Sequence, residues 1–178
     1  MILPWDLIVF DLETAGDPHH RVVEIGAVRV SPDLQIRDTF SSLVDGRPMS
    51  PEVIDVHHIT EPMLQGQPKF AEMHTLFDEF CQKSNVYILG AYGAYFDIPV
   101  LRAEYRRIGV KFPHPGHAID LKGIIWFELL KRGFPSKRLD VDRAVELLGM
   151  KFEGQRHRAL PDAMMEAKAL VAALKGKA

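Results

Sequence analysis

The sequence lacks several features that mark specialised classes of protein. Cys81 is the only cysteine among the 178 residues, so no disulfide can form within the chain, and this favours a reducing cytoplasm. The formal net charge of −2 provides no broad basic surface for a long duplex, so a nucleic-acid ligand would have to be short, bound by its end or held locally. Segment 1–6 has no positive charge and contains Asp6, so we expect a first strand there and neither a signal peptide nor a membrane span.

The residues that are present predict an ordinary globular core. Apolar residues make up 47% of the sequence, and the length suggests one domain over residues 1–178. Strands come first and then alternate with helices, an order that is typical of an α/β domain with a mixed sheet and helices on its faces. The expected strands cover residues 7–10, 22–30, 35–44 and 86–89, and the expected helices begin near residues 51 and 60 or cover residues 70–81, 98–108, 121–130, 139–148 and 159–174.

Two acidic residues follow the apolar run 7–10, which reads as a buried strand. Side chains alternate along a strand, so Asp11 and Glu13 are expected to point to the same side. Two carboxylates that close repel each other, and a divalent cation is the usual remedy. The alternative is a strand end with two solvated acids.

Two further acids and one histidine stand near predicted helix starts. Asp97 lies on the N-terminal side of one helix, and Asp162 lies in the first turn of the C-terminal helix, where the helix dipole alone would favour an acid. His157 precedes Asp162 by five residues and lies just before that helix rather than within an apolar face. This position weakens the alternative that His157 is an ordinary surface or core residue.

Three segments, in this order, resemble the DEDDh-type 3′-to-5′ exonucleases of the proofreading-exonuclease and RNase T group. Residues 10–16 resemble the family's Asp-x-Glu-Thr-x-Gly motif, residues 94–101 its Ala-x-Phe-Asp motif, and residues 157–163 its His-x-Ala-x-x-Asp-Ala motif. A sister subgroup has a tyrosine where this chain has Arg158, so the resemblance is to the histidine subgroup. It implies a single exonuclease domain with a ribonuclease H-like fold, a mixed five-stranded sheet flanked by helices.

The resemblance also implies a reaction. Asp11, Glu13, Asp97 and Asp162 would be the catalytic acids that hold two divalent metal ions, Mg²⁺ or Mn²⁺, and His157 would be the general base. The protein would hydrolyse phosphodiester bonds at the 3′ end of single-stranded DNA or RNA and release nucleoside 5′-monophosphates.

Contacts to the substrate are predicted from the same resemblance. Thr14 is equally compatible with a hydrogen-bonded loop hydroxyl, and Phe96 with a core position. The chain departs from the family at Tyr92 and Gly93, where His-Asn is common, and at His58, where glycine is common. The predicted substrate contacts are Leu12, Thr14, His57, Ile59 and Phe96.

Other polar residues carry weaker predictions. Arg156 and Arg158 flank the proposed base, so one of them could contact a phosphate, although such basic residues are usually solvated. His114 and His117 lie in a Pro/Gly-rich segment, where a solvated loop is expected rather than a metal site.

Two other functions compete with the exonuclease hypothesis. One is a catalytically silent nucleic-acid-binding or polymerase-associated module of the same fold, which the presence of all five catalytic residues disfavours. The other is a generic α/β binding domain with acids placed by chance. The sequence leaves open DNA against RNA, proofreading against repair, and whether the partner is a polymerase or a second copy in a homodimer.

Overall fold

A mixed sheet forms the centre of the computed structural model, which describes residues 3–176 and leaves the start of the predicted first strand, residues 1 and 2, outside. The strands are β1 (Asp6–Thr14), β2 (Val22–Val30), β3 (Ile36–Leu43), β4 (Tyr87–Ala91) and β5 (Ala118–Asp120). Their order in the sheet is β3-β2-β1-β4-β5. Neighbours among β1, β2 and β3 are antiparallel, whereas β4 runs parallel to β1 and β5 parallel to β4. The predicted α/β class with a mixed five-stranded sheet is confirmed.

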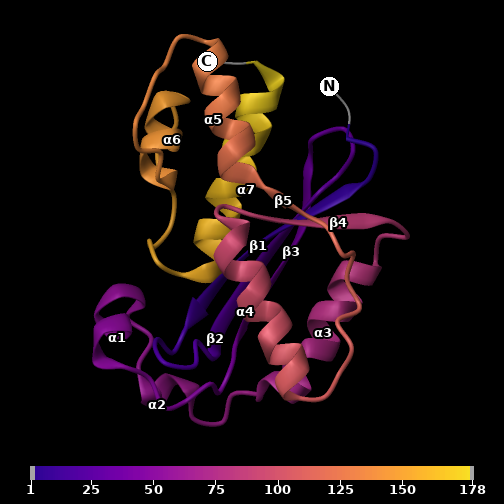
Figure 1. The fold of residues 1–178 in the computed structure, drawn as a ribbon, viewed down its shortest axis with the longest axis vertical. Coiled ribbons are helices and arrows are strands. Elements are labelled where there is room, and N and C mark those ends of the chain that lie inside the picture. Colours follow the sequence, from indigo (N-terminus) through magenta and orange to yellow (C-terminus); the bar gives the residue numbers. More distant parts are fainter. Residues whose placement is uncertain (1–2, 177–178) are drawn as a thin grey trace.

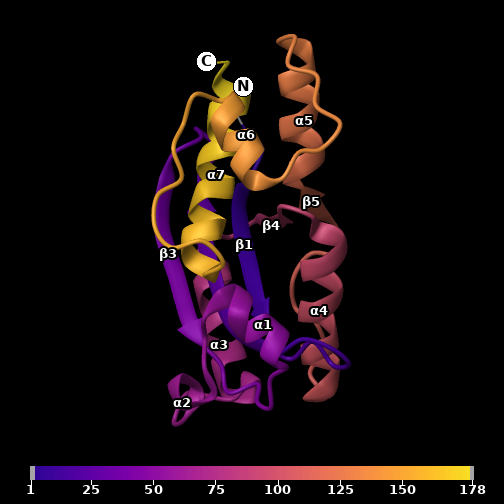
Figure 2. The same ribbon diagram turned by 90° about the vertical axis from the view of Figure 1, so that its left-hand side faces the viewer.

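Helices cover both faces of the sheet. In the described residues they are α1 (Pro51–His57), α2 (Glu61–Leu64), α3 (Phe70–Gln82), α4 (Ala94–Arg107), α5 (Leu121–Lys131), α6 (Val141–Leu147) and α7 (Ala159–Lys175). Helices α5, α6 and α7 lie on one face, and α3 and α4 lie on the other (Figures 1 and 2). No helix within residues 3–176 is long and apolar enough to span a membrane.

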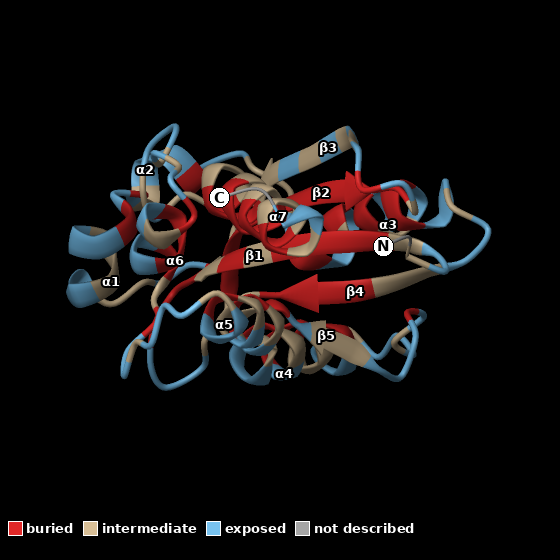
Figure 3. Ribbon diagram, turned by 90° about the horizontal axis from the view of Figure 1, so that it is seen from above, coloured by how far each residue is buried: buried red, intermediate tan, exposed pale blue. Residues whose placement is uncertain are grey.

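The side chains of β1 divide between the two faces because successive residues of a strand point in opposite directions. Leu7 and Val9 pack with α5, α6 and α7, whereas Ile8, Phe10 and Leu12 pack with α3 and α4. Buried residues occupy the centre of the sheet along β1, β2 and β4 (Figure 3). Burial on both faces explains the unbroken apolar run at residues 7–10 of β1.

Two local expectations need correction. Helix α4 begins at Ala94, four residues before the predicted start, and Pro99 lies inside it. Gly93, with a backbone φ of 98°, begins this helix in a conformation that favours glycine. His114 is buried rather than solvated. Its two ring nitrogens form hydrogen bonds to the hydroxyls of Tyr87 and Tyr105, at 2.8 and 3.1 Å.

Candidate active site

Three carboxylates meet at the end of the central strand. Asp11 and Glu13 follow Leu7 and Val9 in the alternation of β1, so they point to the face that α7 covers. One carboxylate oxygen from each of Asp11, Glu13 and Asp162 lies within 4.8 Å of the other two. The expected side-by-side placement of the β1 acids therefore extends to an acid almost at the other end of the chain.

Helix α7 carries Asp162 and lies close to the strand acids because it packs directly on a glycine of β2. Gly26 on β2 pairs with Asp11 across the sheet. A Cβ atom built on Gly26 would lie 2.2 Å from the carbonyl carbon of Ala159 and 2.2 Å from the backbone nitrogen of Leu160. Only a residue without a side chain lets the first turn of α7 rest on the backbone of β2.

A buried ion pair fixes the same helix end. Glu24 pairs with Glu13 across β1 and β2 and is almost fully buried. Its carboxylate accepts hydrogen bonds from Arg158 at 2.6 and 2.9 Å and from the backbone N–H of Ala159 at 2.9 Å. Arg158 is therefore engaged in holding α7, and the predicted phosphate contact by this residue has to compete with the Glu24 pair.

Asp97 completes the acidic set from the opposite face of the sheet. It lies in the first turn of α4 and is 6% exposed, as is Asp162. Both acids open into one cleft of about 300 Å³. The cleft is lined by Asp11, Leu12, Glu13, Tyr92, Gly93, Tyr95, Phe96, Asp97, His157 and Asp162.

The electrostatics of this cleft favour a bound cation. Burial, together with neighbouring carboxylates, raises the pKa of Asp11 well above its usual range. Burial first and Asp162 second raise the pKa of Glu13 to about 8, and burial raises the pKa of Asp97 to about 7. The pKa of Asp162 is also raised by burial, although Arg156 opposes this change. Negative charge is thus concentrated where it is poorly solvated.

His157 lies at the rim of the cleft. Its side chain is exposed, and its backbone has a φ of 57°. The backbone N–H of His157 donates to Oδ2 of Asp162 at 2.8 Å, while Arg156 binds the other oxygen of Asp162 and reaches Asp142 at 3.1 Å. The loop before α7 therefore orients Asp162 and leaves the imidazole free on the cleft side.

The predicted substrate contacts differ in accessibility. Phe96 is 39% exposed and lines the cleft, and Leu12 lines it from a nearly buried position. Thr14, His57 and Ile59 are buried. His57 Nε2 donates to the Thr14 carbonyl at 3.3 Å, and its Nδ1 accepts from the Ile59 N–H at 3.0 Å. These three residues support one another beneath the site, and their contact with a substrate stays a prediction.

Sequence reasoning did not find three residues of this region. Glu24 was detectable as an acid inside an apolar strand, which requires a buried partner. Glu166 follows Asp162 by one helical turn and is buried, with its carboxylate accepting from the Tyr92 N–H at 3.3 Å. Tyr95 lies between two motif residues and gave no signal of its own. Tyr92 itself packs against the core and donates its hydroxyl to the Leu139 carbonyl at 3.0 Å.

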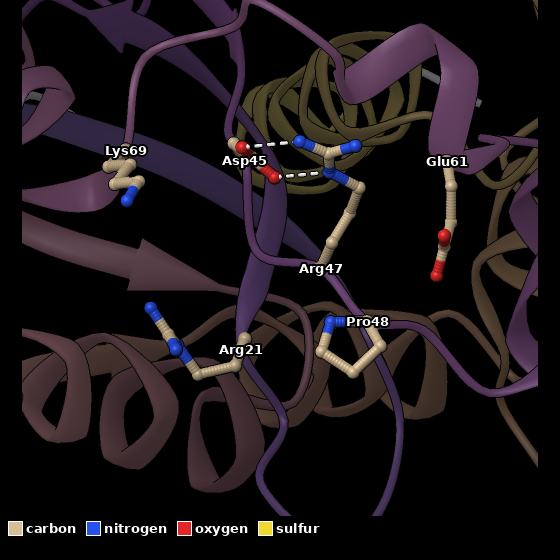
Figure 4. Close-up of a pocket in the computed structure, with 6 residues that line it drawn as sticks. All are labelled: Arg21, Asp45, Arg47, Pro48, Glu61 and Lys69. Atoms are coloured by element: carbon tan, nitrogen blue, oxygen red, sulfur yellow. Dashed lines mark hydrogen bonds and ion pairs between the residues drawn. The ribbon is translucent and has the colours of Figure 1, made fainter.

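A second hollow, of about 370 Å³, lies away from the acidic cleft and shares none of its lining residues. Figure 4 shows that its charged side chains come from several segments and that Arg47 turns toward Asp45. The hollow is lined by Arg21, Asp45, Arg47, Pro48, Glu61 and Lys69. None of the residues predicted for catalysis or substrate contact lies in it.

The residues of the cleft fit divalent cations. Hard cations such as Mg²⁺ and Mn²⁺ prefer carboxylate oxygens, and a set of crowded carboxylates with raised pKa values gains most from a positive charge among them. The fold and the site together define an α/β protein with a cation-attracting acidic cleft at the end of its central strand. Residues 8–170 match the RNase T exonuclease family, so the chain belongs to this family of ribonuclease H-like exonucleases.

Individual relatives agree with this assignment. The chain is 30% identical over 169 residues to the PolC-type DNA polymerase III of Clostridium perfringens, covering 93% of this chain but only 11% of that protein. It is 30% identical over 178 residues to the DNA polymerase III subunit epsilon of Rickettsia conorii, covering 96% of this chain and 74% of that one. The structure of the nuclease domain of 3′hExo, a DEDDh family member bound to rAMP, has the same fold, with a TM-score of 0.84 at 19% identity over 99% of this chain and 95% of that domain.

Proposed function

We propose that the chain acts as one exonuclease domain that removes nucleotides from the 3′ end of single-stranded nucleic acid as nucleoside 5′-monophosphates. The observation that carries this proposal is the convergence of Asp11, Glu13 and Asp162 within 4.8 Å, in a cleft that Asp97 and His157 also line. A solvated strand end would not bring together acids from three separate elements, and two of these acids, Asp97 and Asp162, are buried.

The acids are proposed to hold two divalent ions, Mg²⁺ or Mn²⁺. Asp11, Glu13 and Asp162 would hold one ion directly, and Asp11 would share the second with Asp97, which acts partly through water. When bound, two such metal ions supply charge that stabilises the attacking and leaving oxygens of an in-line displacement. This role agrees with the burial that raises the pKa values of Glu13 and Asp97.

His157 is proposed as the general base. Its imidazole is exposed at the rim of the cleft and takes a proton from the attacking water, a role that contributes roughly 10²–10⁴-fold to a rate. Its backbone N–H keeps one oxygen of Asp162 in place at 2.8 Å. One residue thereby connects the base to an acid of the cation site.

The substrate side of the proposal names a strand end and a partner class. The exposed ring of Phe96 would stack on the terminal base, while Thr14, which follows Glu13, would meet the terminal sugar. DNA and RNA both remain substrates to be tested. The DNA polymerase III names of two relatives make a polymerase the first partner to test and a homodimer the second, and the lone buried thiol of Cys81 favours the cytoplasm.

The test uses single-stranded DNA and RNA that carry a label at either the 3′ or the 5′ end. The protein is incubated with each strand in Mn²⁺ or in EDTA, beside His157→Ala as the matched variant. We expect stepwise release of mononucleotides from the 3′ end, lost in EDTA and slowed at least about a hundredfold in the variant. Binding of the strands without metal-dependent release would instead favour the catalytically silent module.

A further inference from the structure

The rim of the cleft carries an exposed aromatic side chain with no assigned role. Tyr95 is 78% exposed, the largest fraction among the exposed large apolar side chains of residues 3–176, and it lines the cleft beside the acids. Tyrosine presents a flat apolar ring with a polar tip, so it suits a surface that contacts both water and a ligand. The ring of Tyr95 is therefore accessible to a ligand that enters the cleft.

The ring of Tyr95 lies next to Gly93, in the turn that precedes α4. A Cβ atom on Gly93 would lie 3.4 Å from the ring, so the ring rests over the backbone of a residue that has no side chain. The neighbouring aromatic rings are engaged differently. Phe96 makes an edge contact with His20 at 5.6 Å between ring centroids, and Tyr92 is tied to Leu139 through its hydroxyl.

We infer that Tyr95 stacks on the second nucleobase from the 3′ end of the substrate. This inference rests on the proposed function, because it takes a nucleic-acid strand as the ligand. A phosphodiester held at the acids joins two nucleosides, one on each side. Tyr95, Phe96 and Asp97 are consecutive in α4, so their side chains leave the helix about 100° apart, and two aromatic rings diverge next to one acid. Phe96 suits the terminal base, and Tyr95 suits the base before it.

Stacking on an aromatic side chain tolerates every base, since each base has a π-face. The subsite therefore selects for the presence of a base and not for its identity. It favours substrates of at least two nucleotides over small phosphodiesters. It also distinguishes an unstacked strand end from a paired one, where the second base is already stacked within a duplex.

Fluorescence of a strand with 2-aminopurine at the second position from the 3′ end tests the inference without requiring hydrolysis. The strand is bound in Ca²⁺ to the full chain and to the variants Tyr95→Ala and Tyr95→Phe, with Phe127→Ala as a control for loss of an exposed ring outside the cleft. We expect Tyr95→Ala to weaken binding about 5- to 150-fold and to remove the quenching of 2-aminopurine. Tyr95→Phe and Phe127→Ala should bind within about twofold of the unmodified protein.

A second strand, with an abasic residue at that position, isolates the stacking contact. The unmodified protein and Tyr95→Ala should bind this strand equally, because the partner of the ring is absent. Equal loss on both strands, or a loss in Tyr95→Phe as large as in Tyr95→Ala, would overturn the inference. Quenching that depends on Tyr95 without release of mononucleotides supports the stacking and contradicts the proposed hydrolysis. Release of mononucleotides together with unchanged strand binding by Tyr95→Ala supports the proposed hydrolysis and contradicts the stacking.

Discussion

Carboxylates in the acidic cleft and carboxylates at the hollow of Figure 4 have opposite environments. At the hollow, Asp45 accepts hydrogen bonds from Arg47 at 2.6 and 2.9 Å, and these bonds lower its pKa. Arg21 is likewise paired, with Glu104 at 3.0 Å. In the cleft, burial raises the pKa of Glu13 to about 8. An acid paired with arginine is already neutralised, whereas crowded acids without enough cations gain most from a ligand that brings positive charge.

The same contrast occurs between two neighbouring residues. Glu13 and Glu24 face each other across β1 and β2. Glu24 has Arg158 and a backbone N–H as partners, while Glu13 lines the cleft with Asp11 and Asp162 close by. One glutamate therefore holds α7 to the sheet, and the other faces the cleft as a proposed cation ligand. The two residues are both glutamates, and it is the presence of an arginine partner that distinguishes the structural acid from the proposed ligand.

Removal of a cleft acid is expected to have the largest effect. Asp11→Asn should lower the rate of mononucleotide release in Mn²⁺ at least about a thousandfold, because a ligand of both proposed ions is lost. The metal-free variant should be no less stable than the unmodified protein, since repulsion among the acids is relieved. The rate is measured with a labelled strand and the stability by thermal unfolding in EDTA. Asp45→Asn is the matched control, and an equal loss of rate in both variants would remove the distinction between cleft and hollow.

Breaking the Glu24–Arg158 pair is expected to come next. Glu24→Gln should lower the free energy of unfolding by about 1–3 kcal/mol, because it leaves the half-buried Arg158 facing a neutral group. Activity should also fall, since α7 positions Asp162. Urea unfolding followed by circular dichroism measures the first effect. An unchanged urea midpoint would show that the close contact at Gly26 holds α7 without the ion pair.

The pH dependence of the metal-free protein should reveal the raised pKa values. Glu13 has a pKa of about 8 in the folded protein, above its ordinary 4.5, so the folded state binds more protons than the unfolded state between these values. The contribution of Glu13 to stability is therefore largest at low pH and is lost as the pH rises toward 8. Asp97 acts in the same direction up to about pH 7. Urea midpoints from pH 5 to pH 8 in EDTA should fall less steeply in Glu13→Gln, and saturating Mn²⁺ should restore stability at the upper end. Parallel slopes for the two proteins would contradict this view.

The smallest effect is expected at the hollow. Asp45→Asn should destabilise the protein by less than about 1 kcal/mol, because partly exposed ion pairs are weak and are screened by salt. Urea unfolding at low and high salt measures it, and the difference from the unmodified protein should shrink with added salt. A loss as large as that of Glu24→Gln would mean that the hollow contributes to the core.

The sequence predicts which acids meet in the cleft better than it predicts the residues that support them. The side-by-side placement of Asp11 and Glu13 follows from the two-residue period of a strand, whereas Asp97 and Asp162 are selected through the resemblance of their motifs to the family. Glu24 and Gly26 matter only because α7, more than 130 residues later, rests on them, and no local pattern encodes that contact. Helix α4 shows the same limit from the other side. The predicted helix begins at residue 98, whereas the observed helix begins at Ala94, after Gly93 with its positive φ.

The contact at Gly26 has a consequence for how the protein is made. Asp11 leaves the ribosome about 150 residues before Asp162, and the first turn of α7 has to settle on β2 before the two acids meet. Domains are synthesised from the N-terminus, so a chain still in synthesis carries the strand acids without their third partner. The acid cluster is therefore among the last features of residues 3–176 to assemble during synthesis.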